Sequence, residues 1–105
     1  MLEIALIDDK SYGLKHIEKI HVDIEFNLDY FSSFREFEAK METNKKFFDI
    51  IYLDYFLDKD GITGDLVLSE VKKYTKKVIG FSSVQKCSER LKKAGADEAL
   101  EKIFY

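Results

Sequence analysis

Acidic and hydroxyl side chains follow three short apolar segments of this 105-residue chain, and a lysine follows a fourth segment near its end. The segments are residues 4–7, 50–53, 78–81 and 99–101. The residues that follow them are, in chain order, Asp8 and Asp9, Asp54, Ser82 and Ser83, and Lys102. If the segments are strands of one parallel sheet, these side chains meet at the edge where the strands end. We therefore expect them to form one site.

The chemistry of such a site follows from its charges. Two unit charges about 4 Å apart repel by roughly 4 kcal/mol at an effective dielectric constant near 20, so three clustered carboxylates need a cation. Oxygen ligands together with a phosphoryl oxygen suit Mg²⁺ rather than zinc. Asp54 can then act as a nucleophile toward phosphorus, while Mg²⁺ and Lys102 neutralise the phosphoryl oxygens. The Ser82 hydroxyl can donate a hydrogen bond to the third oxygen.

Each of these residues also has an ordinary structural role open to it. Aspartates and serines after a strand are common helix caps, and a single lysine is most often a surface residue. The order favours a site: an acid pair after one strand, an acid after a second, a hydroxyl after a third and a lysine after a fourth. We estimate that all four coincide by chance in roughly one case in ten or fewer.

The apolar periodicity predicts the elements that position the site. The first three segments have the pattern of strands buried on both faces, and residues 22–30 alternate as a strand with one wet face at a sheet edge. Between the strands lie four sets of apolar residues whose spacing is typical of helices. These sets are Leu14, Ile17 and Ile20; Phe34, Phe37 and Met41; Val67, Val71 and Tyr74; and Val84, Cys87, Leu91 and Ala94. Ser32 or Ser33 can cap the second helix, and Gly95 can end the fourth. This alternation predicts right-handed βαβ units and an open parallel sheet covered by helices.

The composition excludes several classes of protein. With 17 basic and 20 acidic residues and no basic cluster, we expect no nucleic-acid binding. No apolar run is long enough for a membrane span, and the N-terminus lacks a secretory pattern. The single cysteine, Cys87, favours a reducing compartment such as the cytoplasm. No linker interrupts the chain, so residues 1–105 are expected to form one domain.

With these residues in view, the chain resembles the receiver domain of bacterial response regulators, in its single-domain, chemotaxis-type form, over nearly its whole length. The matching segments are residues 4–9, 51–57 with Asp60 and Gly61, 78–83, 94–97 and Lys102. The resemblance implies a flavodoxin-like, doubly wound α/β fold with five parallel strands in the order 2-1-3-4-5. This order agrees with the alternating second strand lying at an edge.

The resemblance also implies a function in two-component signal transduction. Asp54 would accept a phosphoryl group from a histidine kinase, a phosphotransfer protein or a small donor, and the changed surface would act on a downstream protein. Mg²⁺ would be held by Asp8, Asp9, Asp54 and the backbone carbonyl of Phe56, with Ser82 and Lys102 contacting the phosphoryl group. Such a protein catalyses only its own phosphorylation and dephosphorylation and is not an enzyme for an external substrate.

Three positions depart from the family pattern. Ile103 follows Lys102 where the family usually has proline, and a trans bond is expected there because a cis bond costs about 3–4 kcal/mol before a non-proline residue. Ala99 stands where the family has a switch aromatic. The chain stops at Tyr105, so the fifth helix is expected to be short or missing unless residues 97–104 are themselves helical. A missing helix should expose apolar side chains of the first and third strands, which predicts a homodimer, a swapped element or a partner on that face.

Two other functions stay open at this point. A pseudo-receiver, acting as a constitutive protein-interaction module without phosphorylation, fits the missing aromatic, the missing proline and the short end. An aspartate-dependent phosphohydrolase usually needs an acid two residues after the nucleophile, where Phe56 stands. Phe56 and Val84 are expected to line the approach to Asp54 and to slow dephosphorylation. His16 and His21 are expected on the surface near the first helix, away from the site.

Overall fold

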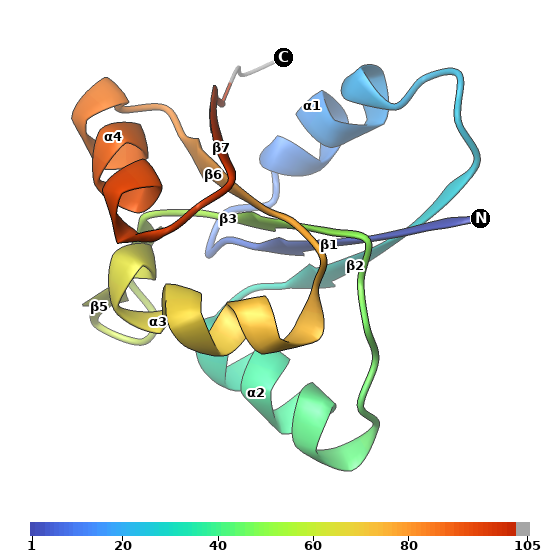
Figure 1. Cartoon of the computed structure of the whole chain (residues 1–105), viewed down its shortest axis with the longest axis horizontal. Coiled ribbons are helices and arrows are strands. Elements are labelled where there is room, and N and C mark those ends of the chain that lie inside the picture. Colours follow the sequence, from blue (N-terminus) through green and yellow to red (C-terminus); the bar gives the residue numbers. More distant parts are fainter. Residues whose placement is uncertain (103–105) are drawn as a thin grey trace.

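The computed structural model, which describes residues 1–102, shows an open sheet of five parallel strands with helices on both faces (Figure 1). The strand order is β2-β1-β3-β6-β7, with β2 and β7 at the edges. Their bounds are β1 Leu2–Ile7, β2 Phe26–Phe31, β3 Ile50–Leu53, β6 Val78–Ser82 and β7 Glu98–Glu101. Counted over this sheet alone, the order is 2-1-3-4-5, and the predicted doubly wound fold is confirmed.

The four predicted helices are all present, and two have the predicted ends. Their bounds are α1 Gly13–Ile20, α2 Phe34–Thr43, α3 Gly64–Val71 with the 3₁₀ turn η1 Lys72–Tyr74, and α4 Gln85–Ala94. Ser33 caps α2, since its Oγ accepts a hydrogen bond from the N–H of Glu36 at 3.1 Å. Gly95 ends α4 with a φ of 121°, a conformation that a side chain would strain.

A short hairpin that the sequence pattern did not predict follows β3. Its antiparallel strands are β4 Phe56–Leu57 and β5 Ile62–Thr63. Gly61 turns the chain between them with a φ of 67°, and its N–H donates to the carbonyl of Asp58 at 3.1 Å. The Asp60 carboxylate accepts the N–H of Phe34 at 2.6 Å, which ties the hairpin to the start of α2. The chain segment that follows Asp54 is therefore held in place by the β4–β5 pairing and by the hydrogen bond between Asp60 and Phe34.

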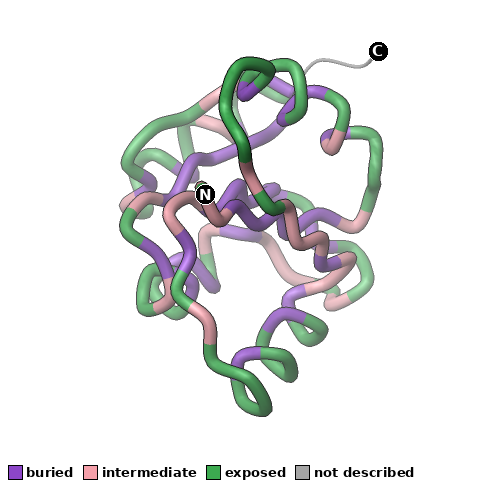
Figure 2. The backbone as a smooth tube through the Cα atoms, turned by 90° about the vertical axis from the view of Figure 1, so that its right-hand side faces the viewer, coloured by how far each residue is buried: buried purple, intermediate pink, exposed green. Residues whose placement is uncertain are grey.

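Side chains of the sheet alternate between two separate cores. We call the side covered by α2, α3 and α4 the three-helix face, and the side covered by α1 the one-helix face (Figure 1). The sheet residues buried on the three-helix face include Ala5, Ile7, Ile51, Leu53 and Val78. Those buried on the one-helix face are Ile4, Leu6, Tyr52, Ile79 and Phe81, beneath Ile17 of α1. Figure 2 shows the buried strands running through the middle of the molecule with exposed turns around them.

Several sequence expectations are wrong, and most of them concern the one-helix face. Its strand side chains are not exposed, because Ile4 and Leu6 are fully buried and Tyr52 is 1% exposed. The predicted homodimer or covering partner therefore loses this physical basis and stays an untested prediction. His16 and His21 are buried rather than on the surface, because their rings pack against Phe81 and Tyr52 respectively.

Two boundaries also differ from the prediction. The second strand begins at Phe26, and the alternating residues before it lie in a turn where Val22 and Ile24 are exposed. Residues 98–101 pair with β6 as a strand, so the alternative of a helix over residues 97–104 is wrong. The expectations for Ile103 and for a short or missing fifth helix fall outside the described residues. Within residues 1–102, no helix is long and apolar enough to cross a membrane.

Candidate functional site

The sheet register brings the predicted site residues to one edge. Asp8 follows β1 and Asp54 follows β3, and the N–H of Asp54 donates to the carbonyl of Ile7 at 3.0 Å. Ser82 is the last residue of β6, and its carbonyl accepts the N–H of Lys102 at 3.0 Å. Residues separated by more than ninety positions therefore meet because parallel strands end together.

Three carboxylates form the centre of this edge. One oxygen from each of Asp8, Asp9 and Asp54 lies within 4.8 Å of the others. Asp8 is fully buried and Asp54 is 6% exposed, so neither charge is well solvated. A compact, oxygen-only donor set of this kind fits a hard divalent cation such as Mg²⁺.

Lys102 supplies a positive charge inside the same cluster. Its Nζ lies 2.5 Å from Asp8 Oδ2 and 3.2 Å from Asp54 Oδ1, and the residue is 5% exposed. Burial acts to lower the pKa of Lys102, but the charges of Asp54 and Asp8 outweigh it and raise the pKa. The ammonium therefore stays protonated.

Asp54 has the unusual titration expected of a buried acid. Burial, and then the charge of Asp8, raise its pKa to about 7 although Lys102 acts in the opposite direction. A second positive charge beside Asp54 would favour its ionised form. The arrangement thus combines a poised carboxylate with groups suited to hold a cation next to it.

A cavity of about 210 Å³ opens onto these groups. It is lined by Asp9, Lys10, Tyr12, Asp54, Phe56, Asp58, Ser82, Ser83 and Lys102. Ser82 is 2% exposed, and its Oγ accepts the N–H of Val84 at 3.2 Å. Phe56 lies in this wall with almost half of its surface exposed, and Val84 is similarly exposed beside Ser82.

Tyr12 and Asp58 were missed by the sequence reasoning. Tyr12 stands three residues after the acid pair, so its proximity to the site was readable from the strand-end rule. Asp58 reaches the cavity through the β4–β5 hairpin, which the turn-forming pair Asp60-Gly61 could have indicated.

Gly64 explains how the loop after Asp54 packs so closely. A Cβ at this position would lie 2.1 Å from the backbone oxygen of Asp54, which leaves no room for any side chain. Its N–H donates to the carbonyl of Tyr55 at 2.6 Å. The hydroxyl of Tyr55 in turn accepts a hydrogen bond from Arg90 of α4 at 3.1 Å. The backbone contact at Gly64 and the Arg90–Tyr55 hydrogen bond therefore anchor the loop after β3 to α3 and α4.

Comparison with solved structures agrees with this topology. A putative response regulator from Chloroflexus aurantiacus superposes with a TM-score of 0.75 at 18% identity, over 99% of this chain and 87% of that one. The BeF3-activated DrrB receiver domain gives 0.72 at 22% identity, over 100% and 87%. The fold is that of a response regulator receiver domain.

A third receiver fold among the solved structures is recorded with a metal. The Mn(2+)-bound form of response regulator Rcp1 superposes with a TM-score of 0.74 at 16% identity, over 98% of this chain and 82% of that one. No family model matches the sequence, and no curated protein matches it closely enough to compare. The receiver likeness therefore rests on the fold, and the acidic cluster independently suggests divalent-metal binding.

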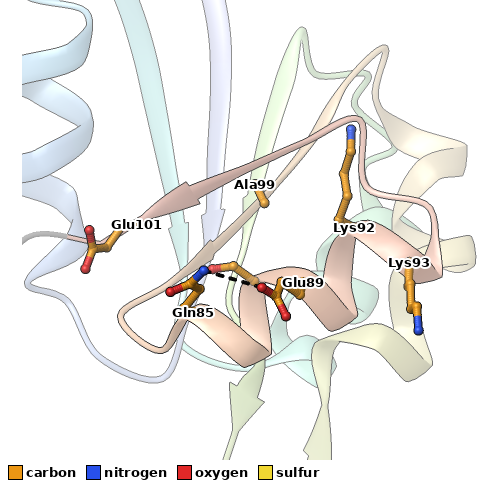
Figure 3. A pocket seen from close by; sticks show the side chains of 7 residues that line it. Gln85, Glu89, Lys92, Lys93, Ala99 and Glu101 are labelled. Carbon is orange, nitrogen blue, oxygen red and sulfur yellow. Dashed lines mark hydrogen bonds between the residues drawn. The ribbon is translucent and has the colours of Figure 1, made fainter.

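This receiver fold also carries a larger groove away from the acidic cluster. It measures about 580 Å³ and lies between α4 and β7, where the small side chain of Ala99 forms part of its wall (Figure 3). Gln85 and Glu89 hydrogen-bond to each other along one side at 3.4 Å. Because the carboxylates and Lys102 gather elsewhere, the smaller cavity is the candidate site for chemistry.

Proposed function

We propose that this protein is a phosphoacceptor receiver of a two-component system and that Asp54 is the residue phosphorylated. The observation that carries the proposal is the contact of one buried ammonium, Lys102, with the carboxylates of both Asp8 and Asp54. A buried charge of this kind is stable only with partners, and here the partners are the groups that phosphoryl transfer requires.

The proposed reaction uses Asp54 as a nucleophile. A carboxylate oxygen forms a bond to the phosphorus of the donor, while the bond from phosphorus to the donor's leaving atom breaks and its electron pair leaves with the donor. Lys102, 3.2 Å from Asp54 Oδ1, would stabilise the negative charge on the transferred oxygens. The Ser82 hydroxyl would donate to another of these oxygens from the neighbouring strand.

Asp8, Asp9 and Asp54 would hold Mg²⁺, together with the backbone carbonyl of Phe56. When bound, Mg²⁺ would offset the charge of the phosphoryl oxygens and favour the ionised form of Asp54. The fit rests on the three carboxylate oxygens within 4.8 Å of one another. Exposed Phe56 and Val84 would limit the access of water to the phosphorylated residue.

The consequences outside the site are those of a signalling module. The donor would be a histidine kinase, a phosphotransfer protein or a small phosphorylated molecule, and the readout would be altered binding of a downstream protein. The protein would act chemically only on itself, in the cytoplasm.

Intact-mass measurement after incubation with acetyl phosphate and Mg²⁺ tests this proposal. Wild type should gain the mass of one phosphoryl group, and Asp54→Asn should gain none. Asp23→Asn is the matched control, because Asp23 is an exposed aspartate in the turn before β2 and should leave the mass gain unchanged. Failure of wild type to gain mass, or a gain by Asp54→Asn, would contradict the proposal.

A pseudo-receiver is the second candidate, and Ala99 is the observation that favours it. At this position an alanine borders the open α4–β7 groove, so no aromatic side chain can change position there. Titration with beryllium fluoride and Mg²⁺, followed by NMR of the backbone amides, separates the two functions. Unchanged spectra for Asp54 and its neighbours would favour a constitutive interaction module.

A further inference from the structure

The ammonium of Lys102 lies close to two aromatic rings as well as to two carboxylates. Its Nζ is 5.6 Å from the centre of the Tyr12 ring and 5.5 Å from the centre of the Phe81 ring. Both distances fall within the range of about 6 Å in which an aromatic face attracts a cation. We call Tyr12 and Phe81 the aromatic clamp.

Phe81 is the fixed half of the clamp. It is fully buried, and its ring packs at 5.2 Å from both the His16 and the Tyr52 rings. On a further side lies Gly13, where an added Cβ would come within 2.8 Å of the Phe81 ring. Close packing against these neighbours leaves the ring little freedom to move away from Lys102.

Tyr12 is the half of the clamp that faces the cavity. It directly precedes α1, is 43% exposed and lines the same cavity as Asp54 and Ser82. Its ring therefore approaches Lys102 from the solvent side, whereas Phe81 approaches from the core. A substitution at Tyr12 changes the surroundings of the ammonium without opening the core.

A lysine at this point needs such restraint. Its flexible stem carries a compact charge, and ordering a lysine side chain costs up to about 2 kcal/mol of conformational entropy. The shorter contact, 2.5 Å to Asp8, would by itself draw the ammonium away from Asp54 at 3.2 Å. The two rings close to Nζ narrow the positions open to it to those that reach both carboxylates.

We infer that Tyr12 is a positioning residue of the phosphoacceptor site, whose ring, together with that of Phe81, holds the Lys102 ammonium next to Asp54. This inference rests on the proposed function for its kinetic consequence, but the position of Lys102 is measurable without it. The attraction belongs to the ring face, so the hydroxyl of Tyr12 is not needed for it.

Two substitutions at Tyr12 distinguish the effect of the aromatic ring from the effect of side-chain size. Tyr12→Leu keeps an apolar side chain without a ring, and we expect it to slow phosphorylation by acetyl phosphate about three- to tenfold. Tyr12→Phe keeps the ring and should stay within about twofold of wild type. Phe47→Leu is the control for loss of an exposed aromatic, since Phe47 is 56% exposed and lies before β3, at the sheet edge opposite Asp54.

The NMR shift of the Lys102 ε-methylene protons provides a readout that does not depend on phosphorylation. Ring currents from the clamp should displace this resonance in wild type and Tyr12→Phe, and Tyr12→Leu should return it toward the position of an exposed lysine. Equal rates and equal ε-proton shifts in wild type and Tyr12→Leu would overturn the inference. If wild type is not phosphorylated at all, the proposed function fails, and the ε-proton shift alone decides whether the clamp exists.

Discussion

The two faces of the sheet bury different kinds of side chain. Three helices cover one face with a core formed mainly of aliphatic side chains and phenylalanines, such as Leu53 and Phe37. On the other face α1 is the one helix formed by residues 1–102, and the buried groups include two histidines and a tyrosine beside the apolar residues. His21 Nε2 and the Tyr52 hydroxyl hydrogen-bond there at 2.9 Å.

This difference shows how the one-helix face buries its strand side chains. The rings of His16 in α1 and His21 at its end pack against the strand residues Phe81 and Tyr52. Each polar atom buried in this way needs a partner, because an unpaired one costs about 1–3 kcal/mol. The same face carries Phe81, which contacts Lys102 of the candidate site. Packing on the one-helix face is therefore coupled directly to the charge of Lys102.

The largest expected effect is the loss of a ring from the three-helix face. Phe37 is 1% exposed and contacts the rings of Phe31, Phe34 and Tyr74. Phe37→Ala should lower the free energy of unfolding by about 3–5 kcal/mol, measured by urea denaturation. Leu66→Ala is the control, because Leu66 is 69% exposed and its loss should cost little. A small effect for Phe37→Ala would show that this face is loosely packed.

Two glycines compare the rigidity of the faces directly. Gly64→Ala would place its Cβ against the Asp54 backbone at 2.1 Å, whereas Gly13→Ala meets the Phe81 ring at 2.8 Å. Overpacking costs about 1–3 kcal/mol, and we expect Gly64→Ala at or above the upper end because a backbone cannot give way. Gly13→Ala should cost less and should also shift the Lys102 ε-proton resonance. Equal losses of stability would remove the distinction between the faces.

The next largest effect on stability is expected from Asp54, which directly follows β3. Because its pKa rises from 3.8 to about 7 on folding, the folded state binds the proton more tightly than the unfolded chain does. The free energy of unfolding should therefore fall as pH rises through this interval, and the full loss applies above it. At about pH 8 without divalent metal, Asp54→Asn should be more stable than wild type, because the variant carries no buried charge at this position. Thermal or urea unfolding at several pH values measures this, and a less stable Asp54→Asn at that pH would contradict it.

The smallest effect is the response of the one-helix face to acid. Burial lowers the pKa of both His16 and His21, so the folded state resists their protonation. The stability that they contribute is present above the unfolded pKa of about 6.5 and is lost as pH falls below it. This loss should be measured in the Asp54→Asn background, because protonation of Asp54 acts in the opposite direction.

Matched variants on the two faces show which face causes the loss of stability at low pH. In the same background, replacing both histidines by glutamine should reduce the fall in unfolding free energy between about pH 7.5 and pH 5.5. Met41→Leu, a volume-conserving change on the three-helix face, should keep the full fall. An undiminished fall in the double histidine variant would show that other groups control it.

The strand-end residues were the part of the site that the sequence determined best. Asp8, Asp54, Ser82 and Lys102 could be placed together because parallel strands of βαβ units end at a common edge. The order of the sheet was implied by the resemblance to receiver domains and agreed with the alternating second strand lying at an edge. A cap at Ser32 or Ser33 followed from their position before an apolar helical pattern, and the structure has Ser33 in this role. The strand-end placement and the cap need only local periodicity and chain connectivity.

The burial of His16, His21 and Tyr52 was decided by tertiary structure alone. A histidine in a helix has the same local sequence pattern whether it faces water or a tyrosine from another strand, and only the close approach of α1 to β3 distinguishes the two. Likewise, the register of β7 brings Lys102 close to both Tyr12 and Phe81, which are separated by sixty-nine positions along the chain. The hydrophobic periodicity predicts which face of an element a side chain occupies. The residue that this side chain contacts depends on how segments distant in the sequence pack together.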